Sequence, residues 1–113
     1  MRITIYHNPG CSNSRRCLDI IREEGFEPTI VEYLKFPPSR MALEALVGKM
    51  GVPAREVVRA KEPVYAELEL QAADDAALLK AMAAHPILLN RPIVVTDKGA
   101  RLCRPPDLVR ALL

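Results

Sequence analysis

One cysteine stands where the pattern of a strand gives way to that of a helix. Cys11 follows a Pro-Gly pair that ends the alternating apolar run at residues 3–6, and it precedes three small polar residues, 12–14. Such residues cap the free backbone N–H groups at a helix start, so Cys11 is predicted at or beside an N-cap. The unpaired donors and the positive end of the helix dipole favour a thiolate and can bind an oxyanion.

The alternative for Cys11 is a small buried hydrophobe, which is the common environment of a free cysteine. Its neighbours argue against that, because His7, Asn8 and residues 12–14 are polar and burying them unpaired would be costly. A phosphatase loop of the C-x5-R type is excluded as well, since the position for its arginine holds Cys17. We therefore predict that Cys11 is a reactive nucleophile.

The second sulfur of a redox reaction must come from elsewhere. Ser14 occupies the position at which a C-x-x-C oxidoreductase carries its resolving thiol. Cys17 shares an apolar helical stripe with its neighbours, and Cys103 lies on a predicted strand near the site, so packing is favoured for both, with a resolving role as the alternative. Three cysteines without paired spacing argue against a disulfide framework or a structural metal.

The elements that position Cys11 follow from periodicity and turn residues. The first part of the chain has the pattern of a strand, a helix and a strand, and the last part has that of a hairpin and a helix. The predicted strands are at 3–6, 29–34, 93–95 and 100–103. The predicted helices are at 12–24, 39–50, 53–59, 74–84 and 105–113. This order predicts one α/β thioredoxin-like domain over residues 1–113, with a four-stranded mixed sheet and a helical insertion at about 35–86.

The composition of the chain limits the classes of binding partner. The chain has 113 residues, half of them apolar, and a formal net charge of only +2, which argues against nucleic acid and anionic membranes. No signal peptide or membrane-spanning apolar run is found, so we expect a cytoplasmic protein, and we expect it to be a monomer.

Two blocks of sequence resemble a known family. Residues 6–15, YHNPGCSNSR, are similar to the active-site segment of the glutaredoxin-linked arsenate reductases. Residues 85–96, HPILLNRPIVVT, followed by Gly99 and by RLCRP at 101–105, are similar to that family's second signature. The resemblance covers nearly the whole chain and identifies it as a shorter member, because such reductases continue with a charged C-terminal extension beyond the position of Leu113.

The resemblance implies a reaction. A thioredoxin-like enzyme of this family reduces arsenate to arsenite, with glutathione as co-substrate, glutaredoxin as partner and no tightly bound cofactor. Cys11 would attack arsenic and form a covalent thiol–arsenic adduct. An external thiol would then take the place of a second cysteine, which explains why Ser14 suffices.

The resemblance also assigns the remaining site residues. Arg59, Arg91 and Arg104 match the family's anion-binding arginines, and Asn8 is counted among the substrate-binding residues. Guanidinium groups pair bidentately with tetrahedral oxyanions, which suits arsenate.

Three further expectations concern the surroundings of the thiol. His7, if protonated, would lower the pKa of Cys11, and Ser14 could hydrogen-bond to the thiolate or to arsenate. By likeness to thioredoxin-like proteins, the Arg91–Pro92 peptide bond is predicted to be cis.

Two other functions stay open. One is a glutathione-dependent thiol oxidoreductase that acts on a different substrate. The other is a non-enzymatic, redox-sensing regulator that binds RNA polymerase; such regulators typically carry C-x-x-C, and Ser14 argues against that switch.

Overall fold

A computed structural model describes all residues from Met1 to Leu113, and the chain divides into two compact units. The first unit comprises Met1–Phe36 and Arg91–Leu113, and the second comprises Pro37–Asn90. The second unit overlaps the helical insertion predicted at about residues 35–86. The division into one domain stays a prediction, and each unit is described by itself.

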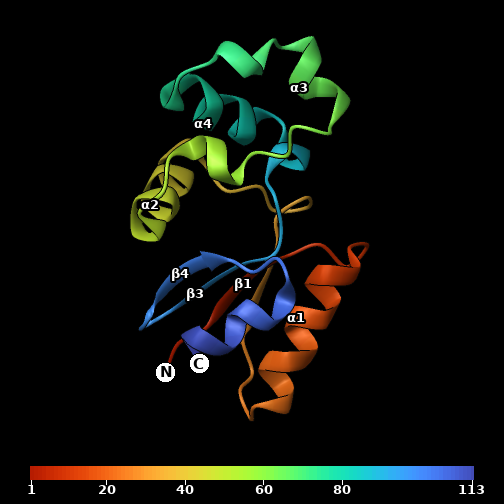
Figure 1. The fold of residues 1–113 in the computed structure, drawn as a ribbon, viewed down its shortest axis with the longest axis vertical. Coiled ribbons are helices and arrows are strands. Elements are labelled where there is room, and N and C mark those ends of the chain that lie inside the picture. Colours follow the sequence, from red (N-terminus) through yellow and green to blue (C-terminus); the bar gives the residue numbers. More distant parts are fainter. The chain divides into compact units, whose positions relative to one another are not determined.

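The first unit contains a four-stranded mixed sheet with the strand order β2-β1-β3-β4 (Figure 1). The strands are β1 (Thr4–His7), β2 (Thr29–Glu32), β3 (Ile93–Thr96) and β4 (Gly99–Leu102). β1 pairs in parallel with β2, whereas β3 runs antiparallel to both β1 and β4. The predicted mixed sheet is confirmed.

Strand β2 ends two residues earlier than the pattern of β-branched residues suggested. The backbone N–H groups of Lys35 and Phe36 donate to the carbonyl of Glu32, at 3.0 and 2.9 Å, so the chain turns there. A local turn has therefore replaced the last part of the expected strand.

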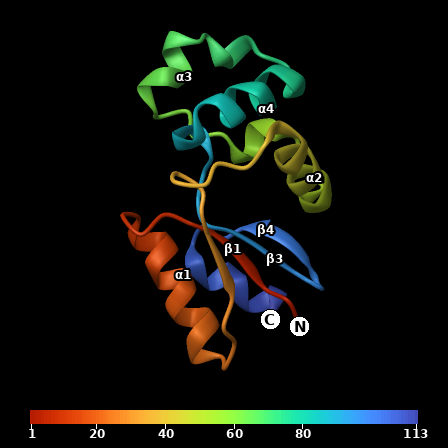
Figure 2. The ribbon, with the colours of Figure 1, turned by 180° about the vertical axis from the view of Figure 1, so that it is seen from behind.

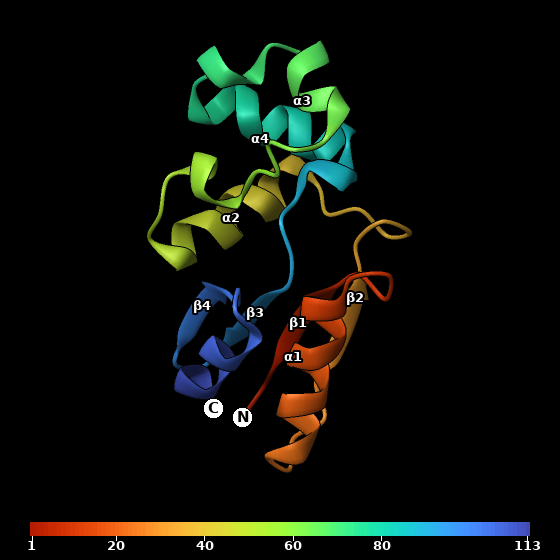
Figure 3. The same cartoon turned by 45° about the vertical axis from the view of Figure 1, so that its right-hand side comes forward.

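Helices α1 (Ser12–Glu23) and η4 (Pro106–Leu112) lie side by side and cover one face of this sheet (Figures 1–3). A buried apolar cluster fills the space between them and the strands; it includes Ile5, Ile20, Ile21, Val94 and Val109. The last helix was predicted, and the structure shows it to be a short 3₁₀ helix, with Leu113 N–H donating to the carbonyl of Arg110 at 3.2 Å.

The second unit is helical. Its elements are α2 (Arg40–Met50), η1 (Ala54–Val57), α3 (Pro63–Glu67), η2 (Leu70–Ala72), α4 (Asp75–Ala84) and η3 (Pro86–Leu88). Side chains cap the two longer helices as the sequence indicates. Ser39 Oγ accepts from the Ala42 N–H at 3.1 Å, and Asp74 Oδ1 accepts from the Ala77 N–H at 2.8 Å.

Helix α3 and η2 lie between the predicted helices at 53–59 and 74–84, where the sequence pattern predicts no regular element. The side chain of Arg55 holds this passage in place: Nη2 donates to the carbonyls of Leu70 and Ala73, at 3.0 and 2.7 Å, and Nη1 donates to the Tyr65 hydroxyl at 2.7 Å. These contacts are separated by ten to eighteen residues along the chain, so no local pattern announces them.

None of the helices is long and apolar enough to cross a membrane. No group of three or more His, Cys, Asp or Glu side chains is arranged to hold a metal ion. The expected cellular location and monomeric state stay predictions.

Candidate active site

Cys11 is the N-cap residue of α1, as predicted. Its backbone is extended, with φ −100° and ψ 123°, and its carbonyl accepts the first helical hydrogen bond from the Arg15 N–H at 3.0 Å. Its side chain makes no capping hydrogen bond. The backbone N–H groups of Asn13 and Ser14 are therefore available to stabilise a charge on the half-buried sulfur.

The turn before Cys11 is built by its own backbone and by Asn8. The Cys11 N–H donates to the carbonyl of Asn8 at 3.0 Å, and the Gly10 N–H donates to Oδ1 of Asn8 at 2.9 Å. From the helix side, Nη1 of Arg15 donates to the carbonyl of Pro9 at 2.8 Å. Asn8, predicted to bind substrate, thus shapes the turn that presents the thiol.

His7 and Ser14 form a buried hydrogen-bonded pair between the end of β1 and the first turn of α1. His7 Nδ1 lies 2.6 Å from Ser14 Oγ, which also accepts from the Asn8 N–H at 3.1 Å. Burial lowers the pKa of His7, and the opposing charge of Glu32 does not compensate. The lowered pKa favours the neutral imidazole. Activation of Cys11 by a protonated His7 stays a prediction.

Two arginines from distant parts of the sequence meet at the sulfur. Arg104 Nη1 lies 3.9 Å from Cys11 Sγ, and the same nitrogen donates to the carbonyl of Arg91 at 2.9 Å. The Arg91 guanidinium itself hydrogen-bonds to Cys11. Arg91 and Arg104 thus both lie at Cys11, and their role in binding the anion stays a prediction. The sequence did not predict that the carbonyl of Arg91 accepts a hydrogen bond from Arg104.

The backbone around the two arginines is also held together. The Cys103 N–H donates to the carbonyl of Pro92 at 2.9 Å, so the residues next to Arg91 and Arg104 are directly linked. The Arg91–Pro92 bond is cis, as predicted, and Arg104–Pro105 is a second cis bond that was not predicted.

The charge balance at Cys11 favours the thiolate. Burial by itself raises the pKa of the Cys11 thiol, but hydrogen bonds from the Ser14 N–H, the Arg91 guanidinium and the Asn13 N–H, together with the charge of Arg91, outweigh it. The pKa consequently lies below its usual range. A nucleophilic sulfur surrounded by guanidinium and amide donors can hold a tetrahedral oxyanion and attack its central atom.

Arg59, the third arginine predicted at the site, belongs to the second unit. Its Nε pairs with Oε1 of Glu62 at 3.0 Å, and its backbone N–H donates to the carbonyl of Leu88. A role of Arg59 in binding the anion stays a prediction.

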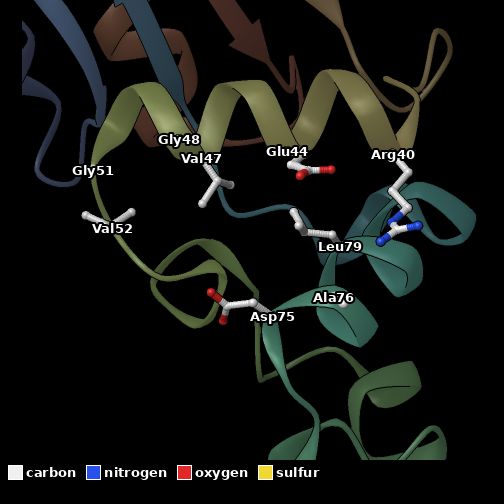
Figure 4. Close-up of a pocket in the computed structure, with 9 residues that line it drawn as sticks. All are labelled: Arg40, Glu44, Val47, Gly48, Gly51, Val52, Asp75, Ala76 and Leu79. Carbon is white, nitrogen blue, oxygen red and sulfur yellow. The ribbon is translucent and has the colours of Figure 1, made fainter.

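The second unit also has a groove of its own, with a volume of about 420 Å³, between α2 and α4 (Figure 4). Its lining is Arg40, Glu44, Val47, Gly48, Gly51, Val52, Asp75, Ala76 and Leu79. No cysteine or histidine is among them, and the carboxylates of Glu44 and Asp75 outnumber the one arginine. The groove therefore lacks the nucleophile and the cationic character of the site at Cys11, and sequence reasoning did not foresee it.

The model of the ArsC family matches residues 6–112. The chain belongs to the ArsC family. It is 51% identical to an arsenate reductase of Rhizobium meliloti (strain 1021), over 100% of this chain and 82% of that protein. It is 50% identical to an arsenate reductase of Escherichia coli (strain K12), over 98% of this chain and 80% of that protein.

A solved structure agrees with the family assignment. The arsenate reductase of Vibrio cholerae superposes with a TM-score of 0.96 at 42% identity, covering 100% of this chain and 98% of that one. The resemblance seen in the sequence and the predicted thioredoxin-like α/β fold are both confirmed.

Proposed function

We propose that this protein is an arsenate reductase in which Cys11 is the nucleophile and arsenate is reduced to arsenite. Its membership of the ArsC family and its relatives named arsenate reductase support this activity. The observation that carries the residue assignment is the meeting of Arg91 and Arg104 at the sulfur of an N-cap cysteine.

Binding of the substrate comes first. Arsenate is a tetrahedral oxyanion, and the guanidinium groups of Arg91 and Arg104 offer planar pairs of donors that match its oxygens. The free N–H groups at the start of α1 offer further donors. We include Arg59 as a third anion-binding residue on the strength of its matching position in the family's sequence pattern.

The thiolate then attacks arsenic. A Cys11 sulfur–arsenic bond forms while an arsenic–oxygen bond breaks and water leaves after protonation. The guanidinium groups neutralise the charge of the oxyanion during this step. Ser14 acts with His7 as a support that positions the turn, since its hydroxyl is engaged by the His7 ring and the Asn8 N–H.

The reducing electrons must come from outside the chain. Cys17 and Cys103 are fully buried, and Ser14 carries no sulfur. Glutathione would add to the adduct, and exchange with glutaredoxin would release arsenite and restore Cys11. Overall, two external thiols lose two electrons and two protons and become a disulfide, while arsenic goes from the pentavalent to the trivalent state and one oxygen leaves as water.

The test is arsenite production from arsenate with glutathione and glutaredoxin. Wild type should produce arsenite, Cys11→Ser should produce none, and Cys17→Ala, which removes a buried cysteine outside the site, should stay active. Omission of glutathione should stop turnover.

Two results would count against the proposal. An active Cys11→Ser variant would show that the nucleophile is misassigned. A folded wild-type protein that makes no arsenite, yet consumes glutathione with another substrate, would favour the alternative thiol oxidoreductase.

A further inference from the structure

The guanidinium of Arg59 is held by a carboxylate three residues further along the chain. Arg59 Nε lies 3.0 Å from Glu62 Oε1, and the exposed fractions of the two side chains are only 25% and 20%. The hydrogen bond uses Nε alone, and neither Nη group of Arg59 donates to a protein acceptor. A guanidinium has five N–H donors, so the edge formed by its two Nη groups stays available for an oxyanion.

The backbone of Arg59 is fixed without help from this ion pair. The Arg59 N–H donates to the carbonyl of Leu88 at 2.6 Å, and the preceding residue, Val58, forms an antiparallel β-bridge with Leu89. Backbone hydrogen bonds therefore set where the side chain of Arg59 begins. The contact with Glu62 sets where the guanidinium points, because a long side chain on a fixed backbone still has several rotatable bonds.

Glu62 stands at a position where its side chain would ordinarily serve its own helix. It is the N-cap residue of α3, and a side-chain oxygen at an N-cap commonly accepts a hydrogen bond from the first turn. The side chain of Glu62 makes no capping bond and pairs with Arg59 instead. Its backbone carbonyl accepts from the Tyr65 N–H at 2.9 Å, so the turn forms without the carboxylate. Departures from a local rule are expected where a side chain serves a site.

We propose that Glu62 is a positioning residue that holds the guanidinium of Arg59 ready for arsenate; this inference rests on the proposed function, in which Arg59 binds that anion. An arginine that is ordered before the ligand arrives loses less conformational freedom on binding. Arginine is charged at every relevant pH, so Glu62 acts on the orientation of Arg59 and not on its protonation.

The carboxylate of Glu62 has two opposing effects on an anion at Arg59. Its oxygen orients the guanidinium, whereas its negative charge repels the anion. Glu62→Gln separates the two, because glutamine keeps an acceptor oxygen and has no charge. Glu62→Ala removes both the acceptor and the charge. Both variants leave the backbone hydrogen bonds of this residue in place.

The experiment measures kcat and KM for arsenate in the full chain, with glutathione and glutaredoxin as the thiol source. Calorimetric titration of Cys11→Ser with arsenate gives Kd for the same changes without turnover. Glu62→Ala should raise KM and Kd about three- to ten-fold, the cost of ordering one long side chain, and leave kcat nearly unchanged. Glu62→Gln should stay within about two-fold of the parent protein, because the acceptor is retained.

Two controls separate positioning from a general effect of charge or stability. Glu23→Ala removes the same charge and breaks the exposed pair with Arg16 at 2.9 Å, so KM for arsenate should not change. Arg59→Ala should raise KM, and adding Glu62→Ala to it should have no further effect, because the two residues act through one group. Urea unfolding of every variant shows whether it is folded under the assay conditions.

Three outcomes would overturn the proposal while leaving the proposed function intact. In the first, folded Glu62→Ala binds arsenate as tightly as its parent or more tightly. In the second, Glu62→Gln binds as weakly as Glu62→Ala. In the third, Glu62→Ala weakens binding equally in the presence and in the absence of the Arg59 side chain. If wild type makes no arsenite, the proposed function fails instead, and the Kd series in Cys11→Ser decides the role of Glu62.

Discussion

Replacing Arg104 with alanine should destabilise the Cys11 thiolate by an amount that follows from distance. Arg104 Nη1 lies 3.9 Å from Cys11 Sγ. Two unit charges at this separation attract by about 1 kcal/mol at the dielectric constant of water and by about 4 kcal/mol at an effective value near 20. Because Cys11 is half-buried at the surface, we take the lower figure. The ratio of thiolate to thiol at a fixed pH should then fall about five-fold.

Arg91→Ala should have the larger effect. Arg91 acts on Cys11 through a hydrogen bond as well as through its charge. Hydrogen bonds to charged groups contribute about 1.5–3 kcal/mol, and partial exposure favours the low end. The thiolate ratio should therefore fall about ten-fold in Arg91→Ala, roughly twice the effect of Arg104→Ala.

The assay follows the ultraviolet absorbance of the thiolate as a function of pH. Cys11→Ser supplies the background from the other cysteines. Arg16→Ala is the matched control, because Arg16 is an exposed arginine on α1 that pairs with Glu23. The reasoning is refuted if Arg91→Ala leaves the ratio unchanged, or if Arg16→Ala lowers it as much as either site variant.

Three predictions concern stability. Ser14→Ala should lower the free energy of unfolding by about 1–3 kcal/mol, because it leaves the buried polar partners of Ser14 unpaired. Urea unfolding measures this change. Ser12→Ala is the control and should have little effect, because Ser12 is exposed. Because burial lowers the pKa of His7, the unfolded state takes up the proton first, so the free energy of unfolding should fall as pH drops below about 6.5. His7→Asn should reduce that dependence, and an unchanged slope would contradict it. Gly51→Ala should destabilise the folded protein by about 1 kcal/mol, because φ is +69° at this position. Gly48→Ala should stabilise it by about as much, because Gly48 lies inside α2 with open space around it. Thermal unfolding that gives the opposite order of stabilities would contradict this prediction.

Sequence reasoning found the features whose causes are local. The N-cap position of Cys11 follows from the residues on either side of it, and α2 and α4 follow from apolar spacing and from the caps Ser39 and Asp74. The four strands follow from short β-branched or alternating runs. Each of these depends on interactions within a few residues, which a pattern can report.

Features set by distant contacts were missed or misjudged. Helix α3 depends on the reach of Arg55, and β2 ends early at a turn. The direction in which the pKa of His7 shifts depends on burial, which no neighbour in sequence reveals. The family resemblance pointed to Arg91 and Arg104, but composition alone could not select them among the 16 lysines and arginines.

The amino-acid sequence by itself determined that Cys11 begins a helix, that Ser14 replaces a resolving cysteine, and that the thiol for a redox cycle must come from elsewhere. Only the tertiary structure decided which charges reach the sulfur. Arg104 and Cys11 are 93 positions apart in the sequence, yet Arg104 Nη1 lies 3.9 Å from Cys11 Sγ. Charge and hydrogen bonding act over a few ångströms of space, so their partners become known only when packing has placed them.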